Sequence, residues 1–185
     1  YFGAPEALLH RSIHLLFTMV LIFFVSPFSK EAWAKKYRWT DGVLILLTLI
    51  CLGYLFVEYE YVITRYSLVH PLNGWDMTLG ILLSLLLIEA SRRAIGPALP
   101  ITAAVFLAYA YIGPYLPGLL RHSGFSTDMI INQLYLTTEG IFGMPLGVSA
   151  TYVILFIIFG TFLEKSGTGQ LFMDFASAIT GWTRG

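Results

Sequence analysis

The sequence predicts an all-α fold, a polytopic bundle of transmembrane helices with one amphipathic helix at the membrane interface. Hydrophobic residues make up 57% of the chain and charged residues only 12%, with a mean hydropathy of +0.74, whereas about a quarter of the residues in a soluble domain are charged. The apolar residues also gather in long runs with almost no charge. These runs cover residues 13–28, 43–57, 77–88, 98–116 and 146–163, with a shorter one at 171–179.

We expect each of the five longer runs to cross the membrane as a helix. A crossing needs about 20 mostly apolar residues, and flanking residues supply the remainder. The strands of a membrane barrel would alternate apolar and polar residues over about ten positions, whereas these runs are continuously apolar. Because a helix satisfies its own backbone hydrogen bonds in lipid, a helical bundle follows.

Composition and motifs argue against several classes of function. The formal net charge is zero, so we expect no nucleic-acid partner. Cys51 is the only cysteine and provides no disulfide or metal framework. His10 and His14 could share a helix face, but no third ligand accompanies them as a zinc site would need. Since no phosphate-binding loop, nucleophile elbow or paired-cysteine motif occurs, we predict neither an enzyme nor a bound cofactor.

The charges at residues 89–93 mark a boundary of the membrane. A charge at the bilayer centre costs about 2.5–3.5 kcal/mol, whereas each Leu, Ile, Phe or Val returns only about 0.3–0.6 kcal/mol. Glu89 stands three and four residues before Arg92 and Arg93, so the three side chains share a helix face and can form ion pairs. Gly96, Pro97 and Pro100 are then expected to break this helix and start another.

Lysines and arginines in the loops predict the orientation, because cytoplasmic loops carry an excess of them. The second loop, residues 58–76, has one arginine against three acidic residues. The first and third loops are basic and contain Lys30, Lys35, Lys36, Arg38, Arg92 and Arg93. We therefore expect these two loops in the cytoplasm, and residues 117–128 and the amino end outside. That orientation is most easily understood if a further span precedes Tyr1.

Residues 126–138 predict the amphipathic helix. Asn132, Gln133 and threonines alternate with apolar residues at helical spacing. Ser126 could cap this helix, and Asp128 suits its first turn. A helix with one apolar and one polar side is expected to lie along the membrane interface.

Glycine and proline follow this helix, and we expect them to interrupt any helix there. They are Gly140, Gly143, Pro145 and Gly147. Irregular backbone at membrane depth is tolerated in transporters where it lines a cavity, so residues 140–147 could form a re-entrant turn. An ordinary loop before the span at 146–163 is an equal alternative.

Two carboxylates lie near predicted membrane segments. Glu139 stands beside the glycine-rich break, and Glu164 precedes Lys165 at the end of an apolar run. Carboxylates in such places often belong to ion or proton pathways. For both we favour a solvated position instead, more strongly for Glu164 because a glycine-containing turn follows it.

Three long strings resemble a known family. They read HRSIHLLFTMVLIFFVSPF, WDMTLGILLSLLLIEASRRAIGPALPI and YLTTEGIFGMPLGVSATYVILFIIFGTFLEKSGTGQLFMDFASAITG. They resemble the membrane component of tripartite ATP-independent periplasmic (TRAP) transporters. More narrowly, they are similar to the fused type, in which small and large permease subunits share one chain and the partner is a TAXI-type binding protein.

This resemblance implies a permease of the bacterial or archaeal inner membrane, driven by an ion gradient that is usually sodium. It would take up small organic anions delivered by the extracytoplasmic binding protein. Residues 1–95 would correspond to the small-subunit scaffold and 96–185 to the start of the large-subunit domain. The sites for substrate and sodium are expected beyond Gly185, so no transport-site residue is assigned here. The alternatives are a membrane scaffold or assembly subunit and, less favoured, a membrane-embedded enzyme.

Overall fold

The structure, a computed structural model, describes residues 7–26, 38–66 and 70–181. All regular structure in these ranges is helical and none of it is β-strand, which confirms the predicted all-α class. The chain forms two compact units, Tyr1–Leu146 and Gly147–Gly185, and each is described by itself.

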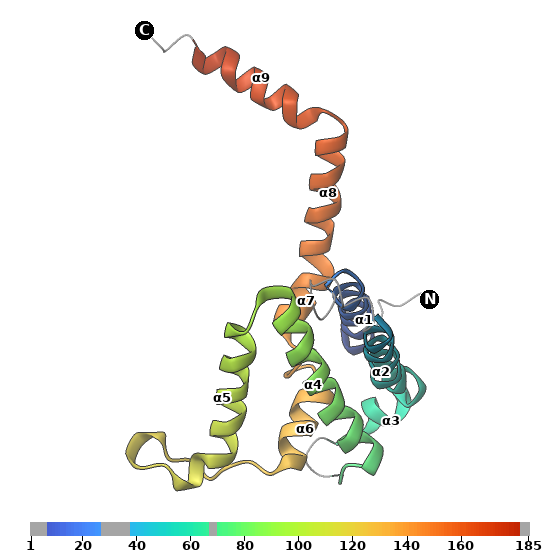
Figure 1. The fold of residues 1–185 in the computed structure, drawn as a ribbon, viewed down its shortest axis with the longest axis vertical. Coiled ribbons are helices and arrows are strands. Elements are labelled where there is room, and N and C mark those ends of the chain that lie inside the picture. Colours follow the sequence, from blue (N-terminus) through green and yellow to red (C-terminus); the bar gives the residue numbers. More distant parts are fainter. Residues whose placement is uncertain (1–6, 27–37, 67–69, 182–185) are drawn as a thin grey trace. The chain divides into compact units, whose positions relative to one another are not determined.

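The first unit contains six α-helices among its described residues (Figure 1). They are α1 (Ala7–Val25), α2 (Arg38–Val57), α3 (Tyr59–Thr64), α4 (Gly74–Ile95), α5 (Ala98–Ile112) and α6 (Thr127–Tyr135). Two 3-10 turns, η2 (Gly113–Tyr115) and η3 (Gly118–Leu120), connect α5 to α6. The helix α7 (Met144–Val148) begins at the end of this unit.

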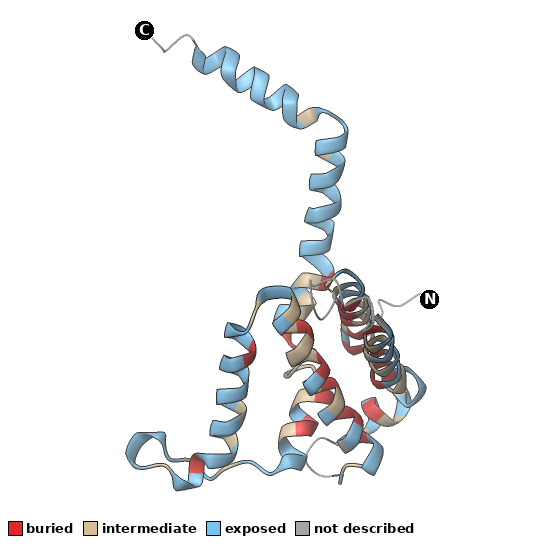
Figure 2. Ribbon diagram, viewed as in Figure 1, coloured by how far each residue is buried: buried red, intermediate tan, exposed pale blue. Residues whose placement is uncertain are grey.

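Helix α4 lies at the centre of the first unit and contacts α1, α2, α5 and α6 (Figure 1). Its buried residues Leu79, Leu83, Leu86 and Ala90 recur every three or four positions, which is the spacing of one helix face. Figure 2 shows the buried residues following α4, while α5 beside it is almost entirely exposed. The core of the unit is therefore assembled around α4.

Two other helices complete this core from one side. On α1, Leu15, Met19 and Phe23 are buried at four-residue intervals. Helix α2 packs against α1 and α4 and contributes the fully buried Thr48, Cys51, Leu52 and Leu55. Without a hydrophobic driving force in lipid, such helices are held together by close packing and hydrogen bonds.

Helix α6 packs against α4 through an apolar face. Ser126 accepts a hydrogen bond from the Met129 amide at 3.3 Å, so the predicted cap is confirmed. The Tyr135 hydroxyl donates to the Cys51 carbonyl oxygen. The amphipathic helix is thus present but ends earlier than the predicted residue 138, because the chain turns after Tyr135. Its placement at the membrane interface stays a prediction.

The close approach of α4 and α6 depends on Gly80. A Cβ atom at this position would lie 2.5 Å from Cγ2 of Ile131 and 3.2 Å from Cβ of Tyr135. Small residues allow helix backbones to approach in membrane proteins. Gly80 therefore sets the distance between these two helices.

The predicted break between the third and fourth spans is confirmed. Helix α4 ends at Ile95, and Gly96 follows with a φ of 97°, a left-handed conformation that glycine adopts without a Cβ penalty. Pro97 then precedes the first residue of α5, Ala98. Its fixed φ suits a helix start.

The segment around the start of α7 differs in part from the predicted interruption at residues 140–147. Gly140 and Gly143 do lie in a turn, but Pro145 and Gly147 fall within helix α7 and do not interrupt it. The first amides of a helix have no intrahelical acceptor, so proline at its second position removes nothing. The Ile141 amide donates to the Leu134 carbonyl oxygen at 3.0 Å, which folds the turn back onto the end of α6.

In the second unit, the end of α7 leads into a π-helical segment, η4 (Ser149–Val153). Helices α8 (Ile154–Lys165) and α9 (Thr168–Thr180) follow. Gly167 separates them with a φ of 74°. The helix end expected after Glu164 is thus confirmed.

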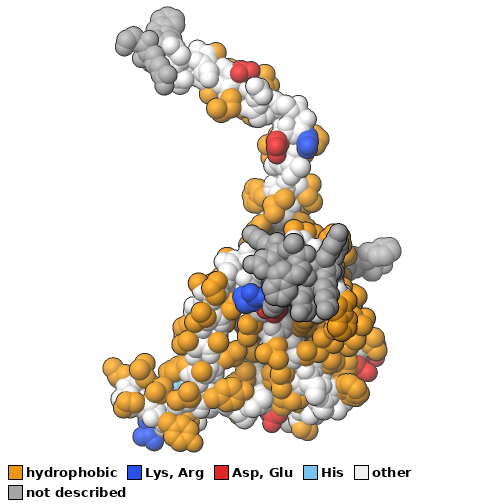
Figure 3. Space-filling view, viewed as in Figure 1, with side chains coloured by type: hydrophobic (Ala, Val, Ile, Leu, Met, Phe, Trp, Pro, Cys, Tyr) orange, Lys and Arg blue, Asp and Glu red, His pale blue; other side chains and the backbone are white. Residues whose placement is uncertain are grey.

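In the part of the chain that the structure describes, four helices are long and apolar enough to cross a membrane. They are Ala7–Val25, Trp39–Val57, Ala98–Tyr115 and Met144–Lys165. The third predicted span, residues 77–88, lies within α4, but α4 is not among these four helices. Figure 3 shows apolar side chains over much of the visible face of the first unit. Such broad apolar exposure is unusual for a soluble protein and suits lipid contact.

Candidate functional site

The charges at the end of α4 form ion pairs around Glu89. Arg92 Nε lies 2.8 Å from Glu89 Oε2, and Arg93 Nε lies 2.7 Å from Glu89 Oε1. The spacing-based prediction of these contacts is confirmed. Glu89 follows the apolar run that ends at Ile88 and so lies outside the predicted membrane-spanning segment. Hydrogen bonds from Arg92 first, and from Arg93, lower the pKa of Glu89 to about 2 although burial opposes them.

Arg93 also joins α4 to α1 and α2. Its side chain is only 3% exposed, and Nη1 lies 2.7 Å from Oδ1 of Asp41 in the first turn of α2. The same nitrogen donates to the Ser26 carbonyl oxygen at 3.3 Å. The guanidinium carbon lies 5.2 Å from the ring centre of Phe23, within cation–π range. One side chain thus connects three helices near their ends.

A second polar cluster lies at the opposite end of α4, around the fully buried Asp76. The Tyr54 hydroxyl donates to Oδ1 at 2.8 Å, and the Tyr61 hydroxyl donates to Oδ2 at 2.9 Å. The Asn73 amide donates to Oδ2 at 3.0 Å and completes a capping box. Burial, and then the bond to Asp76, raise the pKa of Tyr61. The sequence had indicated Asp76 only as an acid of the outer loop.

The turn before α7 is held by a contact with α1. Arg11 Nη1 donates to the Phe142 carbonyl oxygen at 2.6 Å, and Phe142 is fully buried. A Cβ at Gly140 would clash with the Gln133 carbonyl oxygen, and one at Gly143 would lie 2.9 Å from the Gly140 carbonyl oxygen. Both glycines therefore allow backbone contacts that a larger residue would prevent.

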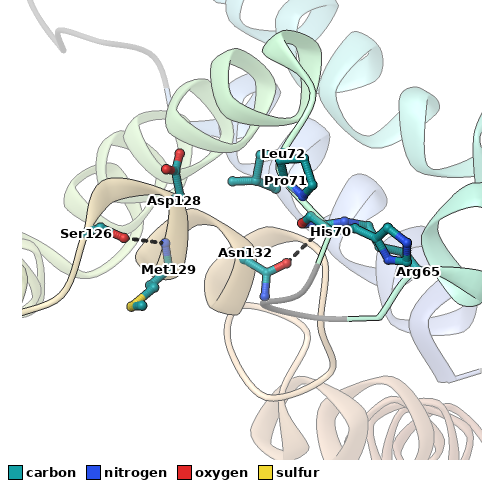
Figure 4. A pocket seen from close by; sticks show the side chains of 8 residues that line it. All are labelled: Arg65, His70, Pro71, Leu72, Ser126, Asp128, Met129 and Asn132. Carbon is teal, nitrogen blue, oxygen red and sulfur yellow. Dashed lines mark hydrogen bonds between the residues drawn. The ribbon is translucent and has the colours of Figure 1, made fainter.

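A cavity of about 330 Å³ lies between the segment that precedes α4 and the start of α6 (Figure 4). Its lining residues are Arg65, His70, Pro71, Leu72, Ser126, Asp128, Met129 and Asn132. Arg65 Nη1 donates to Asn132 Oδ1 at 2.7 Å, the contact drawn as a dashed line in Figure 4. Arg65 Nη2 donates to the His70 carbonyl oxygen at 2.6 Å. No pattern in the sequence indicated this cavity.

The other candidate residues are not assembled into a reactive site. Glu139 is exposed in the turn after α6, and Glu164 is exposed at the end of α8. His10 and His14 lie on α1, and within residues 7–26, 38–66 and 70–181 no three His, Cys, Asp or Glu side chains are grouped as a metal site requires. The polar contacts of the first unit instead hold helices together.

Comparison with known proteins identifies the family. A family model described as "Tripartite ATP-independent periplasmic transporter, DctM component" matches residues 82–185, more than half of the chain. The chain belongs to the DctM family. DctM proteins are transporter permeases and not enzymes, so this chain is part of a multi-pass membrane transporter component. No curated protein and no solved structure matches it.

Proposed function

We propose that this DctM-family chain is part of a secondary transporter of the fused TAXI branch, in the inner membrane of a bacterium or archaeon. The transporter uses an ion gradient, sodium in our proposal, to take up small organic anions that an extracytoplasmic TAXI-type binding protein delivers. The family match at residues 82–185 is the observation that carries this proposal. The resemblance of the strings before residue 82 supports the fused type.

The first unit acts as scaffold in this proposal. Its buried charges and hydroxyls bind one another across helices: Arg93 bonds to Asp41, Tyr54 to Asp76 and Tyr135 to the Cys51 backbone. A scaffold of this kind remains fixed while another part of the transporter moves to alternate access. The residues before about 96 supply the small-subunit part of that scaffold.

A scaffold or assembly subunit without transport activity is the second candidate. The same contacts favour it, because every one of them is structural. The two candidates differ in whether the protein moves solute when its binding protein is present.

Reconstitution tests the proposal. Proteoliposomes containing the full protein would be given a TAXI-type binding protein, radiolabelled organic anions and an inward sodium gradient. We expect uptake that requires both the binding protein and the gradient. Uptake that persists without the gradient would contradict ion coupling, and absence of uptake under all conditions would favour the assembly subunit.

The orientation is tested separately by cysteine labelling. Cys51 is fully buried, so it should not react in the folded protein. Lys35→Cys and Ile95→Cys should react with a membrane-impermeant maleimide only from the cytoplasmic side, and Glu60→Cys only from outside. Labelling of the first two from opposite sides would refute the helical-bundle topology.

A further inference from the structure

Two hydrogen-bond donors on Arg65 and Asn132, residues that line the cavity, have no acceptor among the described residues. Asn132 is only 2% exposed, and its Oδ1 already accepts from Arg65 Nη1. Its Nδ2, and Nε of Arg65, are closed to solvent and find no acceptor among the described residues. Exchanging the positions of the Asn132 amide oxygen and nitrogen would remove the acceptor for Arg65 Nη1, so this hydrogen bond fixes the amide orientation.

Unsatisfied buried donors are rare in folded proteins, and a bound water, ion or ligand commonly supplies their acceptor. Here two such donors belong to residues that contact each other and line the same cavity.

The charge of Arg65 also favours a bound ligand. Arg92 and Arg93 both pair with carboxylates, whereas no carboxylate of the described residues lies within 4.0 Å of the Arg65 guanidinium. Its guanidinium donates to a neutral amide oxygen and to a backbone carbonyl oxygen. A partly buried cation without an opposite charge is costly, and an anion in the cavity would neutralise it.

We propose that this cavity binds an oxyanion, the carboxylate or phosphate group of a small ligand, through Arg65 and Asn132. The guanidinium fork matches both groups geometrically, and α6 presents its N-terminal end to the same cavity, where the helix dipole favours negative charge. Asp128 also lines the cavity but is exposed, so water screens its charge. A cavity of about 330 Å³ suits a small ligand.

The oxyanion could come from a dissolved anion or from a lipid headgroup, and titration distinguishes the two. The full protein would be purified in a maltoside detergent, which lacks phosphate. Succinate, inorganic phosphate and phosphatidylglycerol would then be titrated separately by calorimetry. This measurement does not depend on transport, so its outcome is independent of the function proposed above.

Asn132→Asp is the decisive variant, because it places a carboxylate against Arg65 and supplies the missing anion from within the protein. We expect it to fold and to weaken oxyanion binding by at least about tenfold, or about 1.4 kcal/mol. Arg65→Lys keeps the charge but removes Nε and the planar fork, so it should bind more weakly than the natural protein. Arg121→Gln changes an exposed arginine outside the cavity and is the matched control.

Each outcome decides the proposal. Binding of succinate or phosphate that Asn132→Asp weakens would support it with a dissolved anion as the source, and binding of phosphatidylglycerol alone, with the same dependence, would support a lipid headgroup. No binding by any probe, or equal binding by the natural protein and both variants, would overturn it. Dependence on Asn132 only in the presence of the binding protein would also overturn it, since the donors would then belong to a protein docking surface. If Asn132→Asp failed to fold, as judged by circular dichroism, Arg65→Lys against Arg121→Gln would decide by the same criterion.

Discussion

Replacing Arg93 by methionine should destabilise the first unit far more than the same change at its neighbour Arg92. The Arg93 side chain is 3% exposed and pairs with Asp41, itself 13% exposed. Arg93→Met keeps an apolar stem beside Phe23 but leaves the Asp41 carboxylate without its cation. Removing one partner of a buried pair costs about 3–5 kcal/mol.

Arg92→Met provides the matched control, because Arg92 contacts the same Glu89 but is 42% exposed. An exposed ion pair contributes only about 0–1 kcal/mol. The assay is equilibrium unfolding in mixed detergent micelles, followed by circular dichroism. In the double variant Arg93→Met with Asp41→Asn, part of the loss should be recovered, since no buried charge remains unpaired. Equal losses of unfolding free energy for Arg92→Met and Arg93→Met would refute the conclusion that Arg93 makes the main stabilising contact.

Three further outcomes are expected in the same unfolding assay. Gly80→Ala should lower the free energy of unfolding by about 1–3 kcal/mol through overpacking against Ile131. Gly53→Ala, where a Cβ meets nothing within 4 Å, should not lower it. Equal effects of the two variants would contradict the close packing of α4 and α6. Tyr135→Phe removes the hydrogen bond to the Cys51 carbonyl and should lower the free energy of unfolding by about 0.5–1.5 kcal/mol. An unchanged unfolding midpoint would show that this bond contributes little. The pKa of Glu89 is lowered to about 2 in the folded protein. Its contribution to the free energy of unfolding should therefore be complete above its unfolded pKa of about 4.3 and be lost as the pH falls from there towards 2. Glu89→Gln should flatten the pH profile in that window, and a profile identical to that of the natural protein would argue against the ion pairs.

Features that depend on neighbours along the chain were predictable from the sequence. The α4 ion pairs follow from the three- and four-residue spacing of Glu89 to the two arginines. The stop at Gly96 and the cap at Ser126 follow from local backbone preferences. Pro145 was placed wrongly, because its effect depends on whether it lies at the start of a helix or within one, and the sequence did not locate that start.

Contacts between distant residues were not predictable in this way. Asp41 lies 52 positions before Arg93, and Arg65 lies 67 positions before Asn132. Each looked like an ordinary loop or first-turn residue, since only the packing of α2 and α6 against α4 brings it to its partner. Asp76 could have been suspected, because an acid three residues after Asn73 at the start of an apolar run fits a capping box.

The surroundings of Asp76 restrict how this unit could take part in ion coupling. Both of its carboxylate oxygens are occupied, one by Tyr54 and the other by Tyr61 and the Asn73 amide. A cation binding to this acid would compete with these three donors, which also tie α2 and α3 to the start of α4. Asp76 is therefore a structural contact of the bundle, and in the ion-coupled transporter that we propose we expect the ion's ligands elsewhere.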